Sequence, residues 1–202
     1  MTDAAFWDKI APRYAKSPVS NPSAYEETLT RTRSHLKASD RVLELGCGTG
    51  STALKLRDNV QSYVASDISS GMIGIAREKD GAHDIDFRVA GTAPQAYADL
   101  DVDAVLAFNL LHLVPDFERT LTEIHDILPD GGLFISKTPA IGEKWYYRPM
   151  VAVMRMIRKA PYVRFLKVDE IDHAIAATGF RIVETGLYPP TTPSRFIVAR
   201  KV

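Results

Sequence analysis

Residues 42–50 read VLELGCGTG, an apolar run that passes directly into three closely spaced glycines. Gly46, Gly48 and Gly50 can each adopt a positive φ, and without a side chain they let a ligand lie against the backbone. A helix that begins just after these glycines points its unpaired N–H groups at the same place, where they can bind a carboxylate or another anion. The turn therefore predicts a binding site for a nucleotide-like ligand.

On both sides of this turn the chain alternates between short apolar runs and amphipathic stretches. Expected strands are 41–45, 63–66, 87–89, 104–108 and 133–136, and expected helices between them are 51–57, 71–79 and 117–128. This alternation predicts a doubly wound, Rossmann-like α/β fold with a mostly parallel sheet. Two last strands, 181–185 and 195–199, have no helix between them, so they should pair antiparallel.

An acidic residue ends the second expected strand. Asp67 comes 21 residues after Gly46, and an acid at this place suits the two hydroxyls of a ribose. Its plainer use would be to cap the following helix. The dinucleotide motif G-x-G-x-x-G is broken because Ser51 stands at its third glycine, and no Gly-Lys-Ser/Thr ends the turn as in a P-loop. Nicotinamide enzymes and P-loop proteins are therefore disfavoured.

Three segments together resemble the signatures of class I S-adenosylmethionine (SAM)-dependent methyltransferases. They read ELGCGTG at 44–50, SDIS at 66–69 followed by Met72-Ile73, and AFNLLH at 107–112, and LPDGG at 128–132 also matches. The resemblance runs from about Phe6 to the C-terminus. It is closest to the branch that contains quinone-biosynthesis and small bacterial phospholipid N-methyltransferases.

The resemblance implies a seven-stranded, mostly parallel sheet with the last strand inserted antiparallel, and SAM lying across the C-terminal ends of the early strands. It implies these contacts: Glu44, Gly46, Gly48 and Gly50 with the methionine part, Asp67 with the ribose, Ile68 and Met72 with the adenine, and Asn109 closing the site. The family often has an acid after the third strand for the adenine amine. Gly91-Thr92 stands there instead, and Thr92 could accept that bond.

Two residues are candidates for catalysis. His112 follows the fourth expected strand, and its imidazole could accept a proton from an acceptor hydroxyl or amine, or serve only as a structural loop residue. Tyr14 could cap the site over SAM, or simply anchor a first helix in which Phe6, Ile10 and Tyr14 recur every four residues. The other four histidines show no ligand spacing, so we expect no metal site.

Composition limits the remaining possibilities. The 202 residues fit one domain, with 1–37 as a helical cap and 141–168 as a lid insertion. The 25 basic and 25 acidic residues cancel, which gives no overall field for nucleic acid. Cys47 is the only cysteine and the first sixteen residues hold no long apolar run, so we expect a cytoplasmic protein.

The segment 144–167 has seven basic residues and no acidic one. On a helical wheel Met150, Val153, Met154 and Ile157 share one face, Arg155, Arg158 and Lys159 lie on the other, and Trp145, Tyr146 and Tyr147 precede them. Such a segment can lie at the periphery of an anionic membrane or receive a lipid-like acceptor. It can equally be a lid with a solvated basic face, whereas a nucleic-acid partner is disfavoured because no reading motif is present.

The sequence thus predicts a SAM-dependent methyltransferase that acts on a small-molecule or lipid-like acceptor by in-line displacement. The alternative is a non-catalytic SAM-binding sensor or partner subunit. The acceptor, the methylated atom and the oligomeric state stay open.

Overall fold

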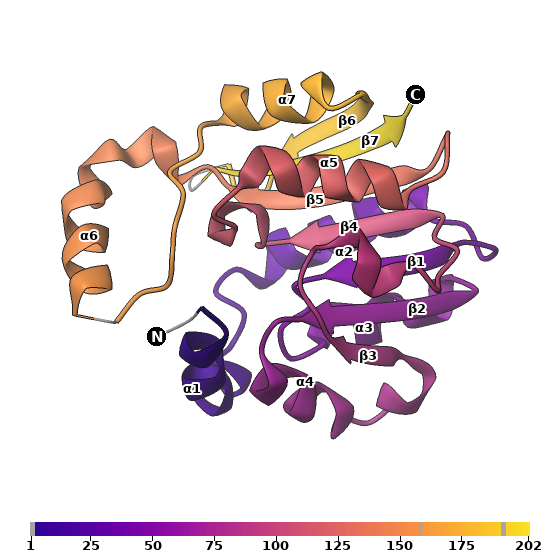
Figure 1. The fold of residues 1–202 in the computed structure, drawn as a ribbon, viewed down its shortest axis with the longest axis horizontal. Coiled ribbons are helices and arrows are strands. Elements are labelled where there is room, and N and C mark those ends of the chain that lie inside the picture. The colour runs from indigo at the N-terminus through magenta and orange to yellow at the C-terminus, as the bar shows by residue number, and fades with distance from the viewer. Residues whose placement is uncertain (1–2, 158, 191–192) are drawn as a thin grey trace.

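The structure, a computed structural model, describes residues 3–157, 159–190 and 193–202, without the side chain of Trp145. Its strands are β1 (Arg41–Leu45), β2 (Ser62–Asp67), β3 (Asp86–Val89), β4 (Ala104–Phe108), β5 (Leu133–Pro139), β6 (Phe180–Leu187) and β7 (Ser194–Lys201). Its α-helices are α1 (Asp3–Ala15), α2 (Pro22–His35), α3 (Ser51–Leu56), α4 (Ser70–Arg77), α5 (Phe117–Ile127), α6 (Arg148–Met156) and α7 (Val168–Ala177). Short 3₁₀ turns join several of them (Figure 1).

The seven strands form one sheet in the order β3-β2-β1-β4-β5-β7-β6. The first five are parallel, and β7 lies antiparallel between β5 and β6. This arrangement confirms the expected fold class, including the inserted antiparallel last strand. The order reverses at β1, which has β2 on one side and β4 on the other, and ligands of open α/β sheets bind at the C-terminal ends of strands at such a point.

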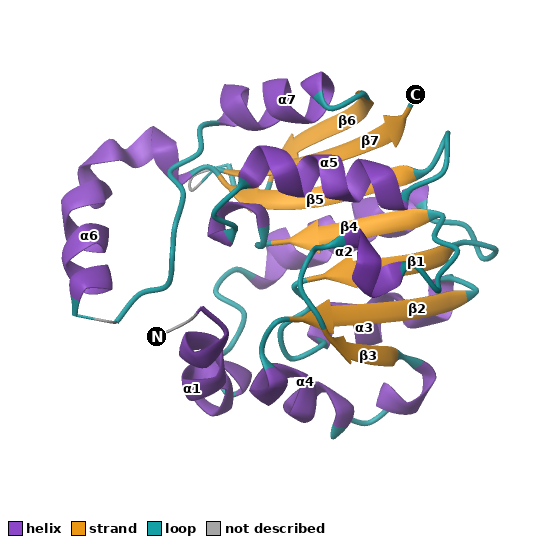
Figure 2. Cartoon of the chain, in the orientation of Figure 1, coloured by secondary structure: helices purple, strands orange, loops and turns teal. Residues whose placement is uncertain are grey.

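Helices cover both faces of the sheet because its central strands are apolar on both sides (Figure 2). On one face, residues such as Leu43 and Val105 pack with α5 and α7. On the other face, Val42 and Leu106 pack with α2, α3 and α4. The amphipathic pattern of α5 explains its place, since Leu121 and Ile124 are fully buried and its other side is exposed.

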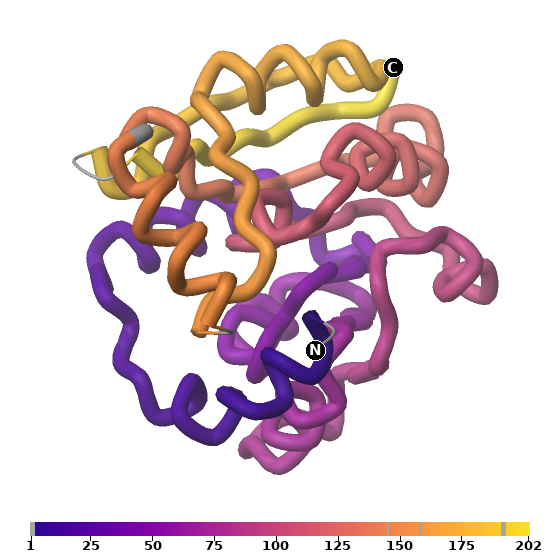
Figure 3. Tube along the Cα trace, turned by 60° about the vertical axis from the view of Figure 1, so that its left-hand side comes forward, coloured from indigo at the N-terminus to yellow at the C-terminus, as the bar shows by residue number. Residues whose placement is uncertain are grey.

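The helices α1 and α6 lie beyond the C-terminal ends of the parallel strands, at the left of Figure 1, and both come forward in the turned view of Figure 3. α1 packs against α4. The Asp8 side chain of α1 accepts hydrogen bonds from the Ser69 hydroxyl (2.7 Å) and the Gly71 N–H (2.9 Å), at the start of α4. The N-terminal segment is thereby held beside the end of β2.

The basic segment differs from the helical-wheel expectation. α6 ends at Met156, so Lys159 lies beyond it and cannot continue a basic helical face, and Arg158 lies outside the described residues. A helix is disfavoured before Pro161, because a residue preceding proline avoids helical backbone angles. Nor is the basic charge all solvated, since Arg164 forms a fork of two hydrogen bonds with the Glu118 carboxylate of α5.

None of the helices in the described residues is both long enough and apolar enough to span a membrane.

Candidate cofactor and active site

A cavity of about 750 Å³ opens at the C-terminal ends of β1, β2 and β4. The structure brings nine of the predicted site residues into its wall: Tyr14, Glu44, Gly46, Gly48, Asp67, Ile68, Met72, Thr92 and Asn109. Two predicted residues, Gly50 and His112, do not line it. Its size is typical of a pocket for a small organic ligand or cofactor.

The three glycines of the turn all have positive φ, yet they serve different purposes. A Cβ added to Gly46 would lie 2.8 Å from the Leu110 side chain, and one added to Gly50 would lie 2.8 Å from the Phe87 ring. A Cβ on Gly48 would meet nothing nearer than the Tyr14 ring, at 3.8 Å. Gly46 and Gly50 thus allow close packing, whereas Gly48 keeps open the space that a ligand against the backbone requires.

Asp67 holds the glycine turn to the end of β2. One carboxylate oxygen accepts the Gly48 N–H and the other accepts the Ser69 N–H, both at 2.9 Å. Burial raises the pKa of Asp67, although both N–H bonds act in the opposite direction. Each oxygen keeps further acceptor capacity toward the cavity, which fits the two hydroxyls of a ribose. The helix cap that the plainer interpretation assigned to Asp67 is provided by Ser69, which accepts the Met72 N–H.

Glu44 is a buried carboxyl at the cavity wall. The Tyr63 hydroxyl donates a 2.8 Å hydrogen bond to it, but burial dominates and raises the pKa of Glu44 to about 7. Because the pKa of this carboxyl lies near neutral pH, a cation that binds beside it can shift the group to its ionised form. SAM carries an ammonium group and a sulfonium, so the residue suits this cofactor.

Aromatic side chains from the first two helices form the outer wall. Tyr14 is half-exposed, and burial of its hydroxyl and the Asp67 charge raise its pKa. Trp7 stands edge-on to the Tyr14 ring, with the centroids 6.4 Å apart. Tyr25 of α2 also lines the cavity and forms a 3.1 Å hydrogen bond with the Thr52 hydroxyl.

At the opposite end, beyond Ile68, the cavity reaches the loop that follows β3. Thr92 lines this end, and its hydroxyl donates a 2.8 Å hydrogen bond to Glu123 of α5, which also lines the cavity. Sequence reasoning did not find Glu123. Its approach depends on how α5 packs, which no local pattern encodes.

The segment after β4 supplies Asn109, whose φ of 57° turns the backbone at the cavity wall. Its N–H donates to the Lys137 carbonyl at 2.7 Å. His112, three residues on, has a buried Nδ1 with no hydrogen-bond partner within the described part of the chain, and burial lowers its pKa to about 4. The ring is therefore neutral near pH 7, and its catalytic role stays a prediction. The described residues contain no group of three or more metal-binding side chains.

The seven-stranded sheet, the glycine turn and the acid at the end of β2 define the Rossmann-like fold of class I methyltransferases. Residues 20–185 match the family described as a methyltransferase domain, and the chain belongs to this family. By family the chain carries a methyltransferase domain, whose cofactor is SAM, and the open face of Gly48, with the free acceptor sites of Asp67, fits SAM.

Curated relatives are similar over part of the chain. A highly reducing polyketide synthase of Fusarium sp is 30% identical over 127 residues, which are 56% of this chain and 5% of that protein. A juvenile hormone acid O-methyltransferase of Bombyx mori is 34% identical over 128 residues, which are 54% of this chain and 46% of that protein. The matches thus span less than half of either relative.

Solved structures share the fold over nearly the whole chain. The complex of DhpI with S-adenosylhomocysteine (SAH) superimposes with a TM-score of 0.79 at 22% identity, covering 98% of this chain and 95% of that one. The [4+2]-cyclase SpnF superimposes with a TM-score of 0.76 at 18% identity, covering 100% and 97%. At these identities the likeness extends to the fold and not to the reaction.

Proposed function

We propose that the protein transfers the methyl group of SAM to a small-molecule or lipid-like acceptor by in-line displacement. The observation that carries this proposal is the shape of the cavity wall, which continues past the cofactor residues. Beyond them, next to polar and charged residues such as Asp116 and Arg119, it includes residues of an apolar or small kind: Ala15, Pro18, Val19, Leu110, Leu113 and Val114. Such a wall provides room for an acceptor next to the donor.

SAM, when bound, supplies an electrophilic methyl group on a sulfonium. The chain then has to hold the acceptor in line and exclude water, which is enough for large rate gains without a strong base. Tyr14 lies where it can cover the donor above Gly48. We assign this capping role to Tyr14. His112 stays a candidate proton acceptor, but it does not line the cavity, so the 110–114 turn would have to move before an acceptor could contact it.

The relatives support an organic acceptor of modest polarity. They are named as polyketide synthases and as a juvenile hormone acid O-methyltransferase, and the apolar cavity wall of this chain suits an acceptor of that kind. The quinone-biosynthesis and phospholipid N-methyltransferase branch that the sequence resembles stays a prediction.

We further propose that the segment 144–167 meets an anionic lipid surface. Four apolar side chains of this segment, Met150, Val153, Met156 and Ile157, are each half or more exposed. Exposed Tyr146 and Tyr147 precede them, and the segment has seven basic residues and no acid. Although Arg164 is paired with Glu118, the remaining basic residues have no acid within the segment, and with the apolar side chains and interfacial tyrosines they fit anionic headgroups above an acyl layer. The single, buried cysteine suits a protein of the cytoplasm that is peripheral to its membrane.

The test of the function is transfer of a labelled methyl group from SAM into cell extract that has been separated into lipid and aqueous fractions. We expect SAH to form and label to enter a product in the organic phase. The rival proposal is a SAM-binding sensor or partner subunit. Tight SAM and SAH binding without label transfer into either fraction would favour that rival.

A further inference from the structure

We propose that Glu123 orients the Thr92 hydroxyl so that it reads the exocyclic amine of adenine, which makes Glu123 the residue that sets the nucleobase specificity of this site. The inference concerns only recognition of the cofactor, so it is independent of the acceptor. It begins from one contact, the 2.8 Å hydrogen bond that the Thr92 Oγ1 donates to the Glu123 Oε2. Both residues line the cavity.

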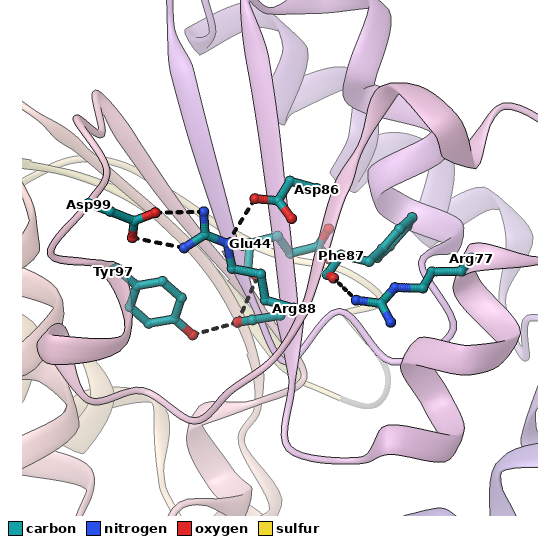
Figure 4. A network of polar contacts seen from close by, with 8 residues as sticks. Glu44, Arg77, Asp86, Phe87, Arg88, Tyr97 and Asp99 are labelled. Carbon is teal, nitrogen blue, oxygen red and sulfur yellow. Dashed lines mark hydrogen bonds and ion pairs between the residues drawn. The ribbon is translucent and has the colours of Figure 1, made fainter.

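The loop that carries Thr92 is fixed relative to Asp67. The Ala90 N–H donates to the Asp67 carbonyl at 3.0 Å. The Tyr97 hydroxyl donates to the Gly91 carbonyl, which pins the residue just before Thr92. The strand before this loop is braced as well, because Arg88 forms a fork of two 2.9 Å hydrogen bonds with Asp99 (Figure 4). These contacts hold Thr92 at a fixed distance from Asp67.

This place is where the nucleobase of the cofactor should lie. With the ribose at Asp67 and the methionine part at Gly48, as the family resemblance implies, the base would extend the other way, along Ile68 toward the cavity wall that follows β3. Residues 90–92 and Glu123 form the wall at that end of the cavity. Of residues 90–92, Thr92 alone has a polar side chain, so its hydroxyl, held by Glu123, is the polar side-chain atom that this loop offers to the edge of the base.

Glu123 decides whether the Thr92 hydroxyl can donate a hydrogen bond to a ligand or accept one from it. A threonine hydroxyl has one proton and two lone pairs, and its proton is donated to Glu123. Glu123 in turn is held by Arg119, whose Nε donates to the other carboxylate oxygen at 3.0 Å. Thr92 can therefore only accept a hydrogen bond from a ligand. The amine of adenine donates, whereas the carbonyl oxygen at the same position of hypoxanthine accepts.

The experiment compares the affinities of SAH and S-inosylhomocysteine by calorimetry. The two ligands differ at the exocyclic position, where adenine has an amine and hypoxanthine a carbonyl, and in the protonation of the adjacent ring nitrogen. We expect the parent protein to bind SAH at least tenfold more tightly. Equal affinities in the parent would overturn the proposal, because the site would then not distinguish a donor from an acceptor.

Glu123→Gln gives the sharper result. Arg119 needs an oxygen, so the Gln amide oxygen turns to it and the NH₂ turns to Thr92. The NH₂ then donates to Thr92 Oγ1, whose own proton is released for the ligand. We expect weaker SAH binding, tighter S-inosylhomocysteine binding, and a preference that shrinks to threefold or less or inverts. A purely structural role would weaken both ligands equally and leave the ratio unchanged, which would refute the assignment.

Two Thr92 variants and one control complete the design. Thr92→Val removes the hydroxyl and should abolish the preference, whereas Thr92→Ser keeps the hydroxyl and should retain it. Glu118→Gln is the matched control, since Glu118 is another α5 glutamate bound to an arginine, and it does not line the cavity. It should leave the ratio as in the parent. Loss of preference in Thr92→Ser or in the control would contradict the proposal even if Glu123→Gln failed to fold.

Discussion

Gly48 and Asp67 act together at the scale of single residues. The hydrogen bond from the Gly48 N–H to Asp67 joins the glycine turn to the acid proposed for the ribose, so the two features that the sequence predicts separately form one structural unit. The backbone N–H of Gly48 binds Asp67, while the absence of a Cβ leaves space beside the turn for a ligand. A change at either residue should therefore disturb cofactor binding more than it disturbs the fold.

Gly48→Val should abolish SAM and SAH binding, because the added side chain occupies the space over which the ligand lies. The substitution also carries backbone strain of about 1 to 2 kcal/mol, since φ is +55°. Gly81→Val is the matched control, because Gly81 has φ +80° and its Cβ would lie near Leu54, outside the cavity wall. Calorimetry and thermal unfolding should show similar stability loss in both variants and binding loss in Gly48→Val alone. Binding by both variants would contradict the role of Gly48.

Glu44 predicts a pH dependence of the ligand-free protein. Its pKa is raised from 4.5 to about 7 by burial, so between these values the folded state keeps a proton that the unfolded state releases. The free energy of unfolding should therefore fall as the pH rises from about 4.5 to 7, by up to about 3 kcal/mol from this group. Urea unfolding of Glu44→Gln should show a weaker decrease over the same window. An identical pH profile in the variant would exclude Glu44 as the source.

How far the site could be predicted depends on whether a residue is defined by its local sequence. Gly46, Gly48 and Asp67 were predictable as cavity residues because the turn and the strand end are local features, whereas Gly50 packs against Phe87 and does not line the cavity. Trp7 could have been found, since it lies on the same helical face as Tyr14, seven residues apart. Glu123 could not, because only the packing of α5 brings its carboxylate to Thr92.

At the scale of elements, α1 and α4 form a coupled pair beside the cofactor site. α1 contributes Trp7 and Tyr14 to the cavity wall, and its Asp8 binds the first turn of α4. That turn follows directly from Asp67 and Ile68, so the position of the aromatic wall is coupled to the position of Asp67. The N-terminal helix thereby forms part of the cavity wall.

Asp8→Asn should loosen α1 without removing the cofactor turn. The hydrogen bonds from Gly71 and Ser69 lower the pKa of Asp8, so its contribution is complete above the ordinary Asp value near 4 and is lost as the pH falls through the lowered pKa. Hydrogen exchange of the α1 amides at pH 7 should be faster in the variant than in the parent. Asp58→Asn, a change at an exposed acid outside the cavity wall, serves as the control. Unchanged exchange in α1 would show that apolar packing alone holds the helix.

The elements themselves were largely predictable, with errors at their ends. All seven strands were expected, since each is a continuous or alternating apolar run. β5 continues to Pro139, three residues past its expected end, because β7 pairs with it as far as Ser194. α6 is shorter than its wheel pattern indicated, because periodicity in the sequence does not show where the backbone leaves the helix.

At the scale of the whole molecule, charge and apolar surface are distributed unequally although the net charge is zero. The segment 144–167 lies beyond the C-terminal ends of the strands, on the side where the cavity opens (Figure 1). Lys37, which precedes β1, and Arg181, the second residue of β6, lie at the opposite end of the sheet, where the parallel strands begin. A surface that binds α6 would therefore also face the cavity mouth, which would allow a lipid-like acceptor to enter from the surface.

The last prediction is that the protein sediments with vesicles of anionic lipid and not with neutral ones, and that added salt weakens the binding. Each basic residue at such a surface contributes about 1 kcal/mol, so Arg155→Gln with Lys159→Gln should lower vesicle affinity by tenfold or more. Lys37→Gln with Arg181→Gln removes the same charge at the opposite end of the sheet and should change binding little. SAM affinity should be equal in all three proteins, since none of these residues lines the cavity. If the parent does not bind anionic vesicles, or if both double variants lose binding equally, the segment is only a solvated lid and the proposal of a lipid surface is wrong.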